Sequence, residues 1–342
     1  MIIVVGKEAS KKQIDYIIGK ISELGLKPLY LPGTEKTVIG AIGDERVLSQ
    51  LNLESLSCVE KVVPILKPYR AVSREFRKQD TIVEVKGHKI GGSHFAMIAG
   101  PCSIESQAQF REAATRLKTL GISFVRGGAF KPRTSPYSFT GLEGEGLQIL
   151  KEVKEETGQI MVTELMDTRD FDAVCAHTDI IQIGARNMQN FKLLKQVGQG
   201  NLPVLLKRGY AATIEEFLLA AEYIVSEGNP NVILCERGIR TFETAYRNTL
   251  DINAIPLLKQ LTHLPVIADP SHGCGKRSLI SPLTKAIVAA GADGAMIEVH
   301  PSPETALSDG DQQLNIEDFA QLLVELRPYL KLAGKEFPEA RP

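Results

Sequence analysis

The feature that most restricts the fold is a repeated alternation of strand and helix patterns from Phe95 onward. Eight short apolar runs, rich in β-branched residues, are each followed by a stretch typical of an amphipathic helix. The runs are FAMIAG, SFVRGG, IMVTEL, DIIQIG, PVLLKR, NVILCERG, PVIADP and GAMIEV. Strands that are apolar throughout indicate a parallel sheet covered on both faces. Eight such units over roughly 240 residues predict an α/β fold of the (β/α)8 TIM-barrel type.

A doubly wound sheet is the competing fold for this alternation. Two observations disfavour it, namely the number of units and the lack of a GxGxxG fingerprint after any strand. The Gly273–Lys276 stretch does not have the GxxxxGK spacing of a P-loop. We therefore expect the barrel.

Residues 1–66 are expected to form a small domain of their own. The predicted order is βαββαβ, the ferredoxin-like order, with strands at 2–5, 26–31, 37–42 and 58–66 and helices at 10–24 and 44–51. Ser10 is a suitable N-cap for the first helix, and Gly25 a suitable end. A stabilising appendage and a regulatory, ACT-like ligand-binding domain both remain open, because element order alone does not choose between them.

Three further boundaries follow from the pattern. Residues 67–80 (KPYRAVSREFRKQD) are polar and basic and predict a linker. Residues 81–90 alternate around Lys86-Gly87 and predict a hairpin that could plug one end of the barrel. The barrel domain is then expected over residues 81–332, followed by a tail at 333–342.

The near-zero overall charge favours a small ligand over nucleic acid or a membrane surface. A formal charge of −1 over 342 residues gives no global field for nucleic acid or for an anionic membrane, so any phosphate binding must be local. No apolar stretch reaches transmembrane length. The five cysteines are scattered without a CxxC pair, which argues against a disulfide framework. We expect a cytoplasmic protein.

Residues 123–139 (SFVRGGAFKPRTSPYSF) have the composition of a phosphate-binding loop. An apolar strand end is followed within a few residues by glycines, cations and hydroxyls, namely Arg126, Gly127, Gly128, Lys131, Arg133, Thr134 and Ser135. Glycines let a backbone approach a ligand closely, and guanidinium groups donate in pairs to phosphate oxygens. A solvated basic loop is the alternative, but such loops rarely need a glycine pair and two prolines.

Chemistry in a barrel lies at the carboxyl ends of the strands. The cations at these ends should converge on one mouth: Arg126, Lys131, Arg133, Arg186, Lys207 and Arg237. Such a set repels itself unless anions offset it, so the mouth should bind about two strongly anionic groups. A second set has the residue types of metal ligands: Cys102, His272, Glu298 and Asp309. Thiolate, imidazole and carboxylate together suit Zn, Mn, Fe or Co.

Several motifs make a resemblance visible. They are AGPCSIES at 99–106, GGAFKPRTSPYSFTG at 127–141, GARNMQN at 184–190, LLKRG at 205–209, CERGIRT at 235–241, ADPSHGCGKR at 268–277 and EVHPSPETALSDGDQQL at 298–314. In combination the chain resembles 3-deoxy-D-arabino-heptulosonate 7-phosphate (DAHP) synthase, of the subfamily that shares its barrel with 3-deoxy-D-manno-octulosonate 8-phosphate synthase. The octulosonate enzymes resemble Lys-Ala-Asn-Arg where this chain has Lys131-Pro132-Arg133-Thr134, which favours the shorter sugar.

The resemblance implies a metal-dependent, aldol-type condensation of phosphoenolpyruvate with erythrose 4-phosphate, which opens the shikimate pathway. It implies a phosphoenolpyruvate site formed by Arg126, Lys131, Arg186, Lys207 and Arg237, next to Ala185. Pro132, Arg133, Thr134 and Ser135 would bind the aldose. The metal on Cys102, His272, Glu298 and Asp309 would polarise the aldehyde oxygen. Lys131 is a candidate proton donor, and Glu164 or Asp269 a candidate base.

The resemblance also bears on regulation and on the alternatives. Some members of the family carry a ferredoxin-like regulatory domain, so feedback inhibition by tyrosine or phenylalanine is expected, with the effector at domain interfaces of a homo-oligomer, expected to be a tetramer. The octulosonate synthase using arabinose 5-phosphate, a nonulosonate (sialic acid type) synthase and a non-catalytic phosphometabolite or amino-acid sensor remain open.

Overall fold

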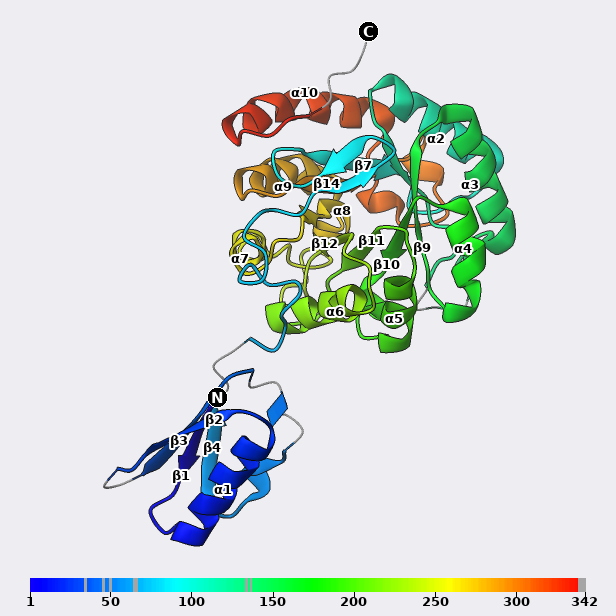
Figure 1. The fold of residues 1–342 in the computed structure, drawn as a ribbon. Coiled ribbons are helices and arrows are strands. Elements are labelled where there is room, and N and C mark those ends of the chain that lie inside the picture. The colour runs from blue at the N-terminus through cyan, green and yellow to red at the C-terminus, as the bar shows by residue number, and fades with distance from the viewer. Residues whose placement is uncertain are drawn as a thin grey trace. The chain divides into compact units, whose positions relative to one another are not determined.

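The computed structural model describes residues 1–33, 36–44, 47–48, 51–63, 67–132, 135 and 137–337. The chain divides into two compact units, Met1–Arg70 and Ala71–Pro342. Figure 1 shows the helices and strands of both units.

The N-terminal unit is a four-stranded antiparallel sheet with one long helix against it. Its elements are β1 (Ile2–Val5), α1 (Lys11–Glu23), β2 (Lys27–Leu31), β3 (Thr37–Ile42), the 3-10 turn η2 (Leu53–Ser55) and β4 (Val59–Val63). The strand order β2-β3-β1-β4 is that of a ferredoxin-like sheet. Helix α1 begins with the predicted cap, because Ser10 and Gln13 form a reciprocal capping box.

The packing of this unit follows from alternation in β1 and helical spacing in α1. Ile3 and Val5 are fully buried, as are Ile17 and Ile21 one turn apart on α1. The ferredoxin-like prediction is thus confirmed for the described residues. The second predicted helix, at 44–51, falls partly on residues that the structure does not describe.

The second unit contains the predicted barrel. Eight parallel strands close into a ring in the order β10-β11-β12-β13-β14-β7-β8-β9. Their bounds are β7 (Ala96–Gly100), β8 (Phe124–Arg126), β9 (Ile160–Glu164), β10 (Ile180–Ile183), β11 (Val204–Lys207), β12 (Val232–Glu236), β13 (Val266–Ala268) and β14 (Gly294–Glu298). Every residue of these strands is buried, which explains why the strands read as continuous apolar runs.

Helices follow the strands and surround the ring, as Figure 1 shows. They are α2 (Gln107–Thr119), α3 (Glu143–Thr157), α4 (Phe171–His177), α5 (Phe191–Gln199), α6 (Ile214–Ser226), α7 (Ala254–Leu261), α8 (Pro270–Cys274), α9 (Arg277–Ala289) and α10 (Ile316–Leu332). Short 3-10 turns lie at η3 (Thr168–Asp170), η4 (Ala185–Asn187), η5 (Pro303–Thr305) and η6 (Gly310–Gln312). The TIM-barrel prediction is confirmed.

A hairpin joins the core of the barrel, as predicted. Strands β5 (Val83–Val85) and β6 (His88–Ile90) pair antiparallel across Lys86 and Gly87, both of which have positive φ. These dihedrals suit a two-residue hairpin turn. The inward side chains Val83, Val85 and Ile90 belong to the same apolar cluster as residues of the barrel strands. The hairpin therefore contributes to the packed interior of the barrel.

The linker predicted over residues 67–80 is corrected by the structure. The amides of Ala71 and Val72 donate to the Glu222 carboxylate at 2.9 and 3.0 Å, and the amide of Arg74 donates to the Leu261 carbonyl at 2.9 Å. Residues from Ala71 onward thus belong to the barrel unit. These are contacts between residues distant in sequence, and a local pattern of polar residues does not reveal them.

The first residues of the predicted tail also pack on the barrel unit. Lys335 donates to the Asp293 carboxylate at 2.7 Å, and the Phe95 amide donates to the Glu336 carbonyl at 2.9 Å. Residues 338–342 lie outside the described part of the chain. The five cysteines are not joined by disulfides. In the described residues, no helix has both the length and the apolar character needed to cross a membrane.

Candidate active site

A cavity of about 270 Å³ opens at the carboxyl ends of the barrel strands. It is lined mainly by polar and charged side chains from several strand ends and the loops that follow them. Eleven of the predicted site residues line it: Arg126, Lys131, Pro132, Ser135, Glu164, Ala185, Arg186, Lys207, Arg237, His272 and Asp309. Arg133 and Thr134 lie outside the described residues. The structure therefore brings together side chains that are up to 183 positions apart (309 − 126).

The glycine pair after β8 is needed for close packing under the cavity. A Cβ at Gly127 would lie 2.6 Å from the Phe110 ring, and one at Gly128 would lie 2.8 Å from the Lys131 side chain. Lys131 can therefore fold back over the backbone, where its Nζ donates to the Cys102 carbonyl at 2.8 Å. The loop sequence thus fixes the place of the Lys131 ammonium.

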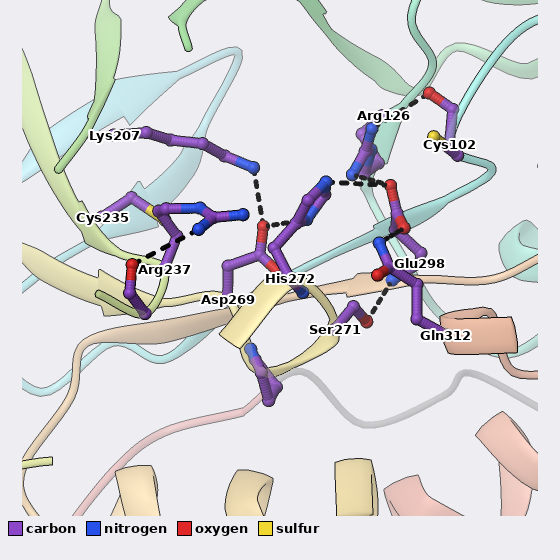
Figure 2. Close-up of polar contacts among 12 residues, drawn as sticks. Cys102, Arg126, Lys207, Cys235, Arg237, Asp269, Ser271, His272, Glu298 and Gln312 are labelled. Carbon is purple, nitrogen blue, oxygen red and sulfur yellow. Dashed lines mark hydrogen bonds and ion pairs between the residues drawn. The ribbon is translucent and has the colours of Figure 1, made fainter. Parts of the chain in front are cut away.

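Two of the predicted cations are paired with buried acids, as Figure 2 shows. Lys207 Nζ lies 2.6 Å from Asp269 Oδ2, and Arg126 Nη1 lies 2.8 Å from Glu298 Oε1. Asp269 and Glu298 are both fully buried. The protein itself thus offsets part of the positive charge that the sequence predicts at the mouth.

Arg186 and Arg237 are held differently. Within the described part of the chain, no carboxylate lies within ion-pair distance of either, and each guanidinium lies against the Tyr210 ring. The guanidinium carbon is 5.6 Å from the ring centre for Arg186 and 4.6 Å for Arg237. These two arginines therefore contribute unpaired positive charge to the cavity.

Three of the four predicted metal ligands form a cluster. Cys102, Glu298 and Asp309 each offer one ligand atom, and these atoms all lie within 4.8 Å of one another. Cys102 Sγ is 3.4 Å from Asp309 Oδ2. Asp309 adopts a left-handed backbone conformation (φ 53°), which aspartate tolerates better than most residues other than glycine.

His272 lies beside this cluster but not within 4.8 Å of all three of its ligand atoms. Its Nδ1 is 2.7 Å from Asp269 Oδ2, and its Nε2 is 3.5 Å from Glu298 Oε1 (Figure 2). Burial lowers the pKa of His272 to about 4, so the ring is neutral at neutral pH. With the Nδ1 proton donated to Asp269, the Nε2 lone pair points toward a carboxylate oxygen. Two lone pairs that face each other in this way favour a cation between them.

The protein surroundings perturb two further groups. Burial, together with the nearby Glu298 charge, raises the pKa of the Cys102 thiol to about 12. Burial alone would lower the pKa of the Lys131 ammonium, but the negative charges around it, Glu298 and Glu164 among them, outweigh burial and the pKa is raised. Lys131 is therefore charged at neutral pH, and Cys102 needs a neighbouring cation to become a thiolate.

Some polar strand ends do not face the cavity. Arg208 follows Lys207 but pairs with the buried Glu236 at 2.9 Å. His300, after β14, has Nε2 at 3.4 Å from the Glu105 carboxylate. Asp269 does not line the cavity and acts on it through its two partners.

Sequence reasoning missed part of the lining. Tyr210, Arg247, Ser138 and Gln182 line the cavity. Behind it lies Gln312, whose Nε2 donates to Glu298 Oε2 at 2.5 Å (Figure 2). Tyr210 follows a strand end by three residues and could have been found from that place. Ser138 and Arg247 lie in loops and Gln182 lies within β10, and no motif in the sequence singles out any of these three residues.

Comparisons with known proteins agree with this geometry. Residues 77–332 match the DAHP synthetase I family, and residues 1–67 match the DAHP synthase ferredoxin-like domain. A Phospho-2-dehydro-3-deoxyheptonate aldolase of Thermotoga maritima is 51% identical over 98% of this chain and 99% of its own length. A 2-dehydro-3-deoxyphosphooctonate aldolase of Geobacter sulfurreducens is 33% identical over 70% of this chain and 94% of its own length.

Solved structures give the same result. The crystal structure of the Phospho-2-dehydro-3-deoxyheptonate aldolase (DAHP synthase) from Thermotoga maritima has a TM-score of 0.93 at 49% identity and covers 98% of both chains. A truncated form of 3-deoxy-D-arabino-heptulosonate 7-phosphate synthase from the same organism has a TM-score of 0.73 at 49% identity and covers 78% of this chain and 97% of its own. The chain is therefore an enzyme of the DAHP synthetase I family.

Proposed function

We propose that the chain condenses phosphoenolpyruvate with erythrose 4-phosphate to 3-deoxy-D-arabino-heptulosonate 7-phosphate and phosphate. The observation that carries this proposal is a cavity lined by unpaired guanidinium groups together with His272 and Asp309, where Asp309 belongs to a cluster of metal-ligand types with Cys102 and Glu298. The first set suits the phosphate and carboxylate of phosphoenolpyruvate, and the second suits an aldehyde oxygen.

Phosphoenolpyruvate would lie against the cations of the cavity. Arg186 and Arg237 have no carboxylate partner among the described residues, so they can donate to phosphate or carboxylate oxygens without first breaking an ion pair. Lys131, Arg126 and Lys207 add positive charge around them. Ala185, next to Arg186, lines the same part of the cavity and leaves room for the ligand.

The aldose would lie toward the loop after β8. Pro132 and Ser135 line the cavity there. We assign Arg133 and Thr134, which lie outside the described residues, to the phosphate end of the sugar because of their place in this loop. A rigid proline next to a guanidinium sets how far the sugar phosphate can lie from the cluster, and so favours one chain length.

The donor set fits a first-row divalent ion such as Mn, Zn, Fe or Co. Cys102, Glu298 and Asp309 cluster, and the Nε2 lone pair of His272 faces Glu298. When bound there, the ion would polarise the aldehyde oxygen as a Lewis acid. Asp269 holds the His272 ring in place through Nδ1, and Gln312 orients the Glu298 carboxylate.

The remaining chemistry is assigned to Lys131 and Glu164. The methylene carbon of phosphoenolpyruvate bonds to the aldehyde carbon, and Lys131 gives a proton to the new hydroxyl. Water then adds to C2, its proton passes to a base, and phosphate leaves with cleavage of the C–O bond. Glu164 lines the cavity, whereas Asp269 is engaged by Lys207 and His272. Glu164 is therefore the better base of the two.

The N-terminal unit is proposed to be regulatory. Its match to the ferredoxin-like domain of DAHP synthases supports this role, and tyrosine or phenylalanine is the effector that suits an enzyme at the head of aromatic synthesis. We further propose a homo-oligomer, a tetramer, that acts in the cytoplasm on small-molecule substrates and not on nucleic acid or membranes.

The octulosonate reaction with arabinose 5-phosphate is the second candidate. The 33% identity to an octonate aldolase over 70% of the chain favours it, but the heptonate relative matches over both units. Incubation with phosphoenolpyruvate labelled with ¹⁸O at the C–O–P bridge tests the proposal. The label should leave with the phosphate, and a seven-carbon product should appear. Binding without turnover would favour a sensor.

A further inference from the structure

The cations around the cavity are held in two different ways. Arg126 and Lys207 are paired with buried carboxylates at 2.8 and 2.6 Å. Arg186 and Arg237 instead lie with their guanidinium carbons 5.6 and 4.6 Å from the centre of the Tyr210 ring. One aromatic side chain thus serves both arginines of the cavity lining that lack an acid partner in the described residues. The guanidinium of Arg240, which does not line the cavity, also lies over this ring at 5.0 Å.

The difference matters because a carboxylate and a ring occupy different parts of a guanidinium. A carboxylate accepts from the N–H edge, which is the edge that an incoming phosphate needs. An aromatic ring attracts the cation through its electron-rich face and accepts no hydrogen bond in the guanidinium plane. A ring can therefore hold an arginine without competing with the ligand.

The buried charge of Arg237 depends on the contact with the Tyr210 ring for compensation. Its side chain is only 2% exposed, and its one hydrogen bond within the described residues is from Nη1 to the Gly238 carbonyl at 3.3 Å. A buried charge with so few acceptors is costly unless another group compensates it. The Tyr210 ring is the group in contact that can do so.

The position of Tyr210 is itself fixed from two sides. The Arg240 amide donates to the Tyr210 carbonyl at 2.8 Å, and Arg208 Nε donates to the Ala212 carbonyl at 3.0 Å. Arg208 is anchored in turn on the buried Glu236. The turn that carries Tyr210 is thus attached to two neighbouring strand ends, and the ring lines the cavity.

We propose that Tyr210 is a positioning residue for substrate binding, whose ring holds Arg186 and Arg237 with their N–H edges free for the anionic groups of phosphoenolpyruvate. This inference rests on the proposed function, in which these two arginines bind that substrate. Tyr210 itself need not touch the reacting atoms. Its role is to keep both arginines ordered before the anion arrives, which lowers the entropic cost of binding.

The test compares Tyr210→Leu, which removes the ring, with Tyr210→Phe, which keeps it. Tyr210→Met, also without a ring, replaces the leucine variant if that variant does not fold. Tyr223→Leu is the matched control, since Tyr223 lies against Phe191 with ring centres 4.7 Å apart and does not line the cavity. The measurements are the dissociation constant of phosphoenolpyruvate by calorimetry, and its KM and kcat in the condensation.

We expect Tyr210→Leu to raise the dissociation constant and the KM for phosphoenolpyruvate about tenfold, with kcat changed less than about twofold. Tyr210→Phe and Tyr223→Leu should stay close to the wild type. Unchanged binding by Tyr210→Leu overturns the inference. So does a phenylalanine variant as weak as the leucine variant, because the ring would then not carry the effect.

Failure of the proposed function gives a different result. In that case the wild type would release no phosphate with either aldose, whatever residue stands at position 210. If the wild type turns over and Tyr210→Leu loses kcat at unchanged KM, the proposed function stands and the positioning role fails.

Discussion

Arg126 and Glu298 form an ion pair at 2.8 Å in which the guanidinium is 4% exposed and the carboxylate is fully buried. The arginine comes from the strand end that begins the predicted phosphate-binding loop, and the glutamate belongs to the candidate metal cluster. The two halves of the site are thus in direct electrostatic contact. Removal of the charge of either residue should therefore change the electrostatic environment of the other half of the site.

Glu298→Gln should weaken metal binding by more than about 100-fold. Removal of a residue that only hydrogen-bonds to a metal ligand typically weakens metal binding by about 10- to 100-fold, so the loss of a ligand should exceed that range. The amide keeps the shape of the side chain but loses the charge that attracts the cation. Equilibrium dialysis against Co²⁺ or Zn²⁺ measures this affinity. Glu304→Gln is the control, because Glu304 is an exposed acid on the loop after β14, paired with Arg277. Full metal occupancy of Glu298→Gln at wild-type affinity would contradict the ligand assignment.

Lys131→Ala should lower kcat by at least about 100-fold, the usual range for the loss of a general acid. The raised pKa of Lys131 keeps the ammonium charged and able to donate at neutral pH. Steady-state rates at saturating substrates separate this effect from weaker binding. Lys151→Ala, an exposed position on α3, should behave as the wild type. Near-normal turnover of Lys131→Ala would remove it from the proton-donor role.

Deletion of residues 1–70 should leave the condensation intact and abolish inhibition by tyrosine or phenylalanine. The cut lies at the boundary between the two units, and a truncated relative has a solved structure that covers 78% of this chain. Rates with and without the amino acid, in both forms, test the regulatory role. An intact enzyme that ignores aromatic amino acids at millimolar concentration would refute it.

The free energy of unfolding should decrease as the pH is lowered below about 6.5, because the buried His263 resists protonation in the folded protein. Burial lowers the pKa of His263, whose ring nitrogens lie 2.7 Å from Thr81 Oγ1 and 2.7 Å from the Ala71 carbonyl. The unfolded chain takes up a proton near pH 6.5, the ordinary value, before the folded chain does. The free energy of unfolding therefore decreases as pH falls from 6.5 toward the lower folded pKa. Urea unfolding at several pH values should show a shallower decline in His263→Asn, and parallel profiles would contradict the assignment.

The barrel was predictable because each strand carries its own signal. Continuous apolar runs such as the one at residues 204–206 are recognisable one at a time, and their number, together with the lack of a GxGxxG fingerprint, favours the closed architecture. The same holds for α1, whose cap residue Ser10 lies next to the helix. Structural features that depend only on residues close in sequence, such as strands and helix caps, are therefore predictable from the sequence.

Structural features that depend on contacts between residues distant in sequence are not predictable in this way. Residues 71–80 look like a linker until Val72 and Arg74 meet the segment around Leu261 and Thr262. The pairing of Lys207 with Asp269 could not be known from the list of strand ends, although it decides which cations remain free. The place of Tyr210, three residues after β11, makes it a candidate from sequence, but its contacts with two arginines from other strand ends are not visible in a local pattern.

The most direct test of the account is phosphate release from phosphoenolpyruvate by metal-replete enzyme, with erythrose 4-phosphate and arabinose 5-phosphate measured side by side. The account predicts a clear preference in kcat/KM for the four-carbon sugar, because the proposed function assigns Pro132 and Arg133 to the end of the aldose site. A preference for the five-carbon sugar would contradict that assignment, and release with neither would contradict the proposed condensation itself.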